Sequence, residues 1–144
     1  MTHTNRIIGA AFTLAIAALA LFVPGCTPDD KPLPQVEGVT AVLGPASQDN
    51  VINTVVVSWT AGTDSRIDGY VIYRAEQGIG ATVGDKSEFV LQALTIATQY
   101  VDDDVHTSAM YPTMRYFYQV AIIDAEGILG PMSPEVMVEY PSHN

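Results

Sequence analysis

Apolar and polar residues alternate with a period of two through most of the chain after residue 36. In TVVVSWT, for example, Val55, Val57 and Trp59 share one face. The clearest alternation is RYFYQVAIID, which runs directly into the turn sequence DAEG. This period predicts β-strands joined by turns. The strands that it predicts most plainly lie within residues 54–60, 69–74, 115–124 and 135–140.

The segment KSEFVLQALTIATQY, residues 86–100, is compatible with two structures. Ser87 is a suitable cap for a short helix, whose apolar stripe would contain Phe89, Val90, Ala93 and Leu94. The same residues also fit two short strands, which is the interpretation that we adopt. The preceding EQGIGATVGDKSE, residues 76–88, is rich in glycine and charge and is typical of a flexible surface loop.

The strand pattern and the composition together predict one all-β domain. The 144-residue chain is 48% apolar and 15% charged, which is typical of a globular protein, and its length allows a single domain with appendages. Several short strands separated by Gly and Pro, with no long helical pattern, favour an immunoglobulin-like β-sandwich of about seven strands. We place this domain at residues 36–141 and a short tail at residues 142–144.

Five segments of this domain resemble a fibronectin type III domain: VEGVTA, VVVSWTAG, IDGYVIYRAE, YVDDDV and YFYQVAIIDAEGILGPMSPEV. The resemblance implies that Trp59 is the buried tryptophan of the family and that Tyr70 is the core aromatic residue of the third strand. It also implies that Tyr116 forms a tyrosine corner, in which the hydroxyl bonds to nearby backbone. The predicted core contains Trp59, Tyr70, Ile72, Tyr116, Tyr118, Val120 and Ile122.

The N-terminal 25 residues have the layout of a secretory signal peptide. Arg6 precedes an apolar run from Ile7 to about Val23. The run ends in VPGC, which resembles the lipobox of bacterial lipoproteins and implies that Cys26, the only cysteine, carries diacylglycerol after cleavage. An uncleaved membrane anchor is the main alternative, because the run is near the lower limit of about 17 residues for a spanning helix. Plain secretion is the third interpretation.

Residues 26–35 contain the lipidated cysteine and a linker with three prolines and three charged residues, which predicts a semi-extended spacer. We therefore expect a bacterial cell-envelope protein whose domain is exported from the cytoplasm and anchored through an N-terminal lipid. The inner and outer membranes remain equally open as locations.

The net charge of −10 changes the range of partners that we expect. Nucleic acid is excluded, because phosphate binding requires clustered Lys and Arg and this chain has six basic residues scattered singly. Electrostatic adhesion to an anionic membrane is disfavoured for the same reason, so any membrane contact depends on the lipid or on the apolar run.

Few residues of the chain are candidates for catalysis or metal binding. His106 is the only histidine within the predicted domain, and the sequence shows no phosphate-binding loop, dinucleotide motif or metal-ligand spacing. The run from Asp102 to Asp104 is a candidate calcium site, because Ca²⁺ prefers clustered carboxylate oxygens as ligands. Consecutive strand residues point in opposite directions, so we favour a solvated strand end in which one aspartate bonds the turn backbone. We expect no catalysis, no cofactor and no bound metal.

A candidate partner surface follows from the strands taken together. The resemblance implies that the third, sixth and last strands are neighbours in one sheet. If Trp59 and Tyr116 face inward, the outward residues of these strands are largely apolar, which is typical of a contact site. This surface contains Val71, Tyr73, Phe117, Ala121, Ile123 and Met137. The alternatives are that the segment from Ala75 to Ala97 folds over it, or that a register error has exchanged the two faces.

These observations predict a noncatalytic, lipid-anchored interaction or spacer module that presents its domain to an envelope or extracellular protein. The alternative is a carbohydrate-contact or accessory module. Such a module needs aromatic platforms beside amide or carboxylate groups, for which Tyr73 and Phe117 are the candidates.

Overall fold

A computed structural model describes residues 31–45 and 54–141 of the chain. The predicted signal peptide, the predicted lipidation site Cys26, residues 27–30 of the linker and the tail from residue 142 lie outside these residues. The described part contains seven strands: β1 (Thr40–Leu43), β2 (Val55–Ser58), β3 (Ile67–Ile79), β4 (Val90–Thr95), β5 (Gln99–Asp102), β6 (Thr113–Asp124) and β7 (Val136–Pro141). No helix in these residues is long and apolar enough to cross a membrane.

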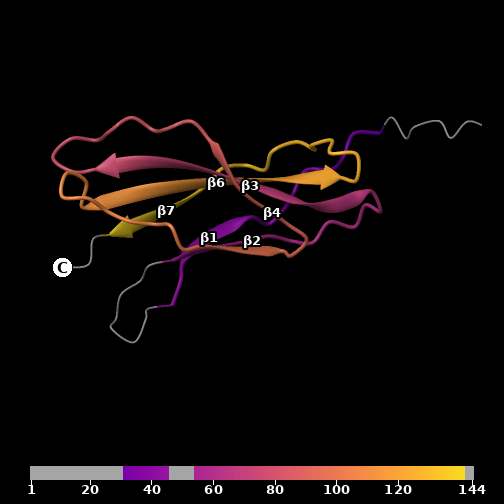
Figure 1. The fold of residues 1–144 in the computed structure, drawn as a ribbon, viewed down its shortest axis with the longest axis horizontal. Helices are drawn as coiled ribbons and strands as arrows, with labels where there is room; N and C mark the ends of the chain where they lie inside the picture. Colours follow the sequence, from indigo (N-terminus) through magenta and orange to yellow (C-terminus); the bar gives the residue numbers. More distant parts are fainter. Residues whose placement is uncertain (1–30, 46–53, 142–144) are drawn as a thin grey trace, which may run out of the picture. The chain divides into compact units, whose positions relative to one another are not determined.

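The strands form two antiparallel sheets, which confirms the all-β sandwich. One sheet has the order β1-β2-β5 and the other the order β4-β3-β6-β7. In Figure 1 the sheet that contains β3 and β6 lies above β1 and β2, and the chain crosses from one layer to the other between β4 and β5. The longest ladder joins β3 and β6, which pair from Ile67–Asp124 to Ile79–Thr113.

The core lies between the sheets and contains all seven predicted core residues. From the three-stranded sheet, Val55 and Val57 point inward because they alternate with Val56 and Ser58. Trp59 follows β2 directly and packs edge-to-face on Tyr70, with the ring centroids 5.4 Å apart. Aromatic pairs in this geometry stabilise a core by about 0.5–1.5 kcal/mol beyond the area that they bury.

One ambiguous segment is resolved by the structure, and one predicted loop differs from it. Residues 90–95 and 99–102 form strands, so the helix considered for residues 86–100 is absent and the two-strand interpretation is confirmed. The loop predicted for residues 76–88 was partly wrong, because β3 continues to Ile79 by pairing with β6. Glycine lowers intrinsic strand preference, but here twelve residues of β6 provide a continuous partner for the ladder.

The predicted DAEG turn joins β6 to the segment that leads to β7. Asp124 accepts hydrogen bonds through its carboxylate from the amides of Glu126 and Ile128, at 3.1 and 2.7 Å. Gly127 has a φ of 82°, a conformation that favours glycine over residues with a Cβ. The turn therefore forms because Asp and Gly occupy the positions that its backbone requires.

Candidate functional site

The tyrosine corner implied by the resemblance is present. The hydroxyl of Tyr116 donates to the carbonyl of His106 at 2.9 Å and accepts from the amide of the same residue at 2.8 Å. This pair of bonds fixes the connection between β5 and β6 although that connection is long. Tyr116 is fully buried, and burial raises its pKa to about 12. The hydroxyl therefore has a structural role.

A charged cluster that the sequence did not reveal lies between the sheets. Nη1 of Arg74 in β3 donates to both carboxylate oxygens of Asp102 in β5, at 2.9 and 2.8 Å. The Tyr118 hydroxyl and the Asp104 amide donate to the same carboxylate, at 2.8 and 3.1 Å. On the other side, Nη2 of Arg74 donates to Glu76 at 2.6 Å. The cluster links the two sheets by charge and hydrogen bonds.

Each buried group of this cluster is satisfied by the others. Burial disfavours the charged form of Arg74, but the hydrogen bonds and charge of Asp102 together outweigh it and raise the pKa of the guanidinium. Burial, together with the adjacent Asp102, also raises the pKa of Tyr118 far above its usual value. The Arg74 guanidinium lies 5.3 Å from the centre of the Tyr116 ring. Arg74, Asp102 and Tyr118 are buried and bonded to one another, so we assign the cluster to stability.

The aspartate run therefore differs from the solvated strand end that we expected. Asp103 and Asp104 are exposed, but Asp102 is fully buried because Arg74 neutralises it. One detail of the prediction is correct, since Asp102 bonds the turn backbone at Asp104. In the two described stretches of the chain, no group of three or more acidic, histidine or cysteine side chains is arranged to hold a metal ion. His106 is exposed and contributes its backbone to the tyrosine corner.

The outer face of the four-stranded sheet is the face opposite the core. Four of the six candidate surface residues are at least partly accessible there: Tyr73, Phe117, Ile123 and Met137. The other two were wrongly expected to be exposed, because Val71 is 4% exposed and Ala121 is 0% exposed. They pair with each other in the middle of the sheet. Val71 also lies opposite Leu94. The side chains of Val71 and Ala121 are short, so longer side chains beside them on the same face can screen them from solvent.

The segment between β3 and β4 covers one end of this outer face, as one alternative in the sequence analysis anticipated. Figure 1 shows it running back above β3. Nζ of Lys86 lies 4.4 Å from the centre of the Phe117 ring and 4.9 Å from that of Phe89, and it pairs with Glu135. The ring of Phe117 is therefore already in contact with a cation of the same chain.

The accessible end of the outer face lies at β4, which the candidate surface omitted. Leu91 and Leu94 are 56% and 66% exposed, and Ile96 beyond the strand is 86% exposed. A register shift opposite Ile72 and Tyr73 brings Leu91 opposite Tyr73 and Leu94 opposite Val71. Both leucines thus lie on the outer face although they are three residues apart. We call Val90, Leu91, Leu94 and Ile96 the β4 apolar edge.

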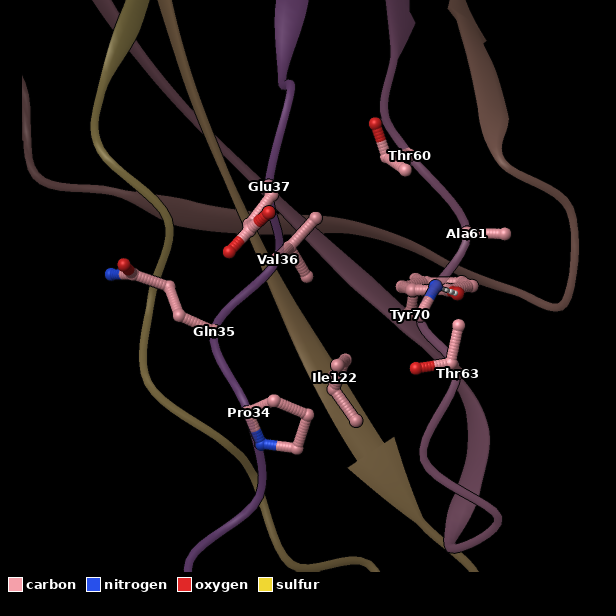
Figure 2. A pocket seen from close by; sticks show the side chains of 10 residues that line it. Pro34, Gln35, Val36, Glu37, Thr60, Ala61, Thr63, Tyr70 and Ile122 are labelled. Atoms are coloured by element: carbon pink, nitrogen blue, oxygen red, sulfur yellow. Dashed lines mark hydrogen bonds between the residues drawn. The ribbon is translucent and has the colours of Figure 1, made fainter.

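A pocket of about 270 Å³ is lined in part by residues 34–37, close to the start of the described chain. Figure 2 shows residues 34–37 on one side and 60–63 on the other, with Tyr70 and Ile122 between them. The Tyr70 hydroxyl already accepts a bond from the Gly62 amide at 2.9 Å. Glu37 is the one acidic residue in the lining. The other polar side chains of the lining are those of Gln35, Thr60, Thr63 and Tyr70, with no histidine or second carboxylate among the described residues that line it.

Comparison with two solved fibronectin type III domains supports the fold. A fourth FNIII domain from human has a TM-score of 0.57 and 16% identity, with 90% of this chain and 95% of that chain covered. The third fibronectin III domain of human KIAA0343 protein has a TM-score of 0.54 and 16% identity, covering 83% and 91%. The spore cortex lytic enzyme SleM of Clostridium perfringens has a TM-score of 0.49 and 17% identity, and this chain spans only 29% of it.

No family model and no curated protein matches the chain. The structural likeness shows that the fold is a fibronectin type III-like β-sandwich. The strand order, the tyrosine corner and the buried tryptophan all agree with this fold.

Proposed function

We propose that this protein is a noncatalytic, lipid-anchored module of the bacterial cell envelope that presents its fibronectin type III-like domain for contact with another protein. The observation that carries the proposed contact is the β4 apolar edge. The four exposed side chains of this edge lie within residues 90–96, and contiguous apolar patches on the surface of a soluble domain commonly mark contact sites. The lipid anchor rests on the VPGC sequence and on the apolar run before it.

Carbohydrate contact has weaker support from the same surface. A glycan site needs an open aromatic ring with polar groups beside it, but the Phe117 ring is covered by Lys86. The nearby Gln119 amide is engaged as well, since it donates to the Ser133 carbonyl at 3.2 Å. Tyr73 pairs with Leu91, so its surroundings on the open side are apolar. This pattern suits a protein surface better than a sugar.

Photo-cross-linking in cells tests the proposal directly. A photoreactive amino acid placed at Ile96 of the C-terminally tagged protein should give one stoichiometric protein adduct in the membrane fraction. The same amino acid at Val42, an exposed apolar position on the three-stranded sheet, should not give this adduct. The double substitution Leu91→Ser and Leu94→Ser should abolish the adduct, and Val42→Ser with Val101→Ser should leave it unchanged.

Cys26→Ser tests the anchor in the same experiment. We expect the variant to leave the membrane fraction or to remain unprocessed, and the adduct to be lost with it. Equal adduct patterns from Ile96 and Val42 would contradict the proposed contact surface. Retention of glycan in a pull-down, with no protein adduct from Ile96, would favour the carbohydrate alternative.

A further inference from the structure

The backbone of β4 has one open side. β4 is the end strand of the order β4-β3-β6-β7, so it pairs with β3 on one side only. Edge strands expose unpaired N–H and C=O groups, and proteins usually block them with charged residues, proline or bulges. β7, the opposite edge of the same sheet, carries Glu139 and ends at Pro141. β4 carries neither a charge nor a proline.

Only a weak local device protects this edge. The bulge at residue 92 interrupts the ladder with β3, and the Gln92 side-chain amide donates to the carbonyl of Val90 at 3.1 Å. A side chain that bonds two residues away can rotate out and leave the carbonyl to another donor. The residues that follow, Ala93 to Thr95, continue the pairing with β3 and leave their other side open.

The side chains of the edge are suited to an apolar partner. Leu91 and Leu94 project on the outer face and are more than half exposed, and Ile96 extends the apolar edge beyond the strand. A strand paired along β4 would place alternate side chains on this face, beside the two leucines. An extended segment with apolar residues at alternate positions would therefore bury them, and its backbone would pair with the open groups of β4.

The charged residues around β4 restrict which partner segments could pair with it. Four basic residues of the described part are paired internally, in the pairs Arg66–Asp64, Arg74–Asp102, Lys86–Glu135 and Arg115–Glu139. Acidic residues lie at both ends of β4. Asp85 and Glu88 precede it, and Asp68 lies two residues before Tyr70, the partner of Thr95. These three side chains are exposed and form no ion pair among the described residues.

We propose that β4 binds, by strand addition, an extended segment of a partner protein that alternates apolar residues and carries Lys or Arg at both ends. This inference rests on the proposed function and names the chemistry of the partner. Backbone pairing supplies the affinity and the pattern of side chains supplies the specificity. A second copy of this chain is a poorer occupant, because it brings the same acidic groups and the same net charge of −10.

Selection from a displayed library of random 12-residue peptides against the full-length chain in detergent tests the inference. We expect the enriched peptides to alternate apolar residues between basic ends. Synthetic copies should slow hydrogen exchange of the amides in residues 90–96 at least about tenfold, with no such change in β7. Their affinity should fall as salt rises from low to physiological concentration.

Matched variants separate strand addition from simple apolar or ionic contact. N-methylation at alternate core positions of the peptide, which removes backbone donors but keeps charge and side chains, should weaken binding at least about tenfold. Replacing the basic ends by Glu should have a similar effect. On the protein, Leu94→Lys should weaken binding at least about tenfold, whereas Val42→Lys on the other sheet should not.

Other results would overturn the inference. One such result is that N-methylation does not weaken binding of the enriched peptides. Others are enrichment of acidic or proline-rich peptides, failure to enrich any peptide, or sedimentation showing that a second copy of the chain occupies β4. The photo-cross-linking test remains separate. An adduct from Ile96 without peptide strand addition would refute the inference and leave the proposed protein contact standing. Absence of both the adduct and peptide binding would refute both the inference and the proposed protein contact.

Discussion

The carboxylate of Asp102 lies in the interior, where it accepts hydrogen bonds from Arg74, Tyr118 and the amide of Asp104. Arg74 and Tyr118 come from the four-stranded sheet, whereas Asp102 ends β5 of the other. A buried ion pair adds little net stability compared with a well-packed apolar pair, but removal of one partner leaves the other charge uncompensated. The two sheets therefore depend on the pair being complete.

We expect Asp102→Ala to lower the free energy of unfolding by about 3 kcal/mol or more, because it leaves the Arg74 guanidinium buried with less compensation. Urea unfolding monitored by tryptophan fluorescence measures this change. Asp103→Ala removes an exposed neighbouring carboxylate and should change stability by no more than about 0.5 kcal/mol. Equal stabilities for the two variants would refute the role of the cluster, and Arg74→Met combined with Asp102→Leu should recover most of the loss.

At this scale the sequence predicts hydrophobic residues better than charged ones. The seven core residues follow from alternation and from the resemblance. An apolar side chain that faces inward is buried whichever residues of the other strands it packs against. Asp102 could not be separated from Asp103 and Asp104, since its partner Arg74 is 28 residues away. A buried charge becomes recognisable only when the fold brings its counter-charge to it.

At the scale of elements, Tyr111 joins the connection between β5 and β6 to the β3–β4 hairpin. Glycines at 78 and 84 leave room for its ring, and a Cβ built at Gly78 would overlap the ring atoms. The Tyr111 backbone is tied to Ser108, which donates its amide to the Tyr111 carbonyl at 3.1 Å. Glycine in the middle of a strand is usually unfavourable, but here it provides the close approach that the ring requires.

We expect Gly78→Ala to destabilise the domain by about 1–3 kcal/mol, because the added methyl group must displace the Tyr111 ring. In the background Tyr111→Ala the same substitution should cost clearly less, since the obstacle is absent. Urea unfolding of the four proteins of this double-mutant cycle gives the coupling energy. Additive effects would show that the ring does not limit the size of residue 78.

The end of β3 and the accessible surface of the sheet could not be predicted from the sequence. Period-two alternation indicated β2, β6 and β7, but it missed the end of β3 because Gly78 carries no pattern and its pairing with Met114 is long-range. The accessible surface was harder to predict. Val71 and Ala121 alternate correctly but are too short to reach solvent, and the bulge that aligns Leu91 with Leu94 breaks the alternation from which faces are assigned.

At the scale of the whole domain, several tyrosines are held in the neutral form by the fold. Burial raises the pKa of Tyr116 to about 12 and raises those of Tyr100, Tyr118 and Tyr140 above the usual value of 10.0. In the unfolded chain these groups lose their protons near pH 10. The unfolded state therefore binds fewer protons than the folded state above that pH, so alkali favours unfolding.

We expect the free energy of unfolding to be insensitive to these tyrosines below pH 9 and to fall as pH rises beyond 10. Tyr118 alone should contribute a slope of about 1.4 kcal/mol per pH unit, because one proton is retained on folding. Urea titrations at intervals from pH 9 to 11 measure the slope. Tyr118→Phe should make the slope shallower by about 1.4 kcal/mol per pH unit, because the variant lacks this proton. An unchanged slope in this variant would contradict the assignment.

The link between the sheets through Arg74 and Asp102 has a consequence for where folding can take place. Small exported domains often rely on disulfides, whose formation depends on the redox potential of the compartment. Here the only sulfhydryl group of the chain is Cys26, which precedes the sandwich. Closure of the two layers needs no oxidant, and reducing agents leave their connection intact. The domain is thus equally able to fold in a reducing and in an oxidising environment.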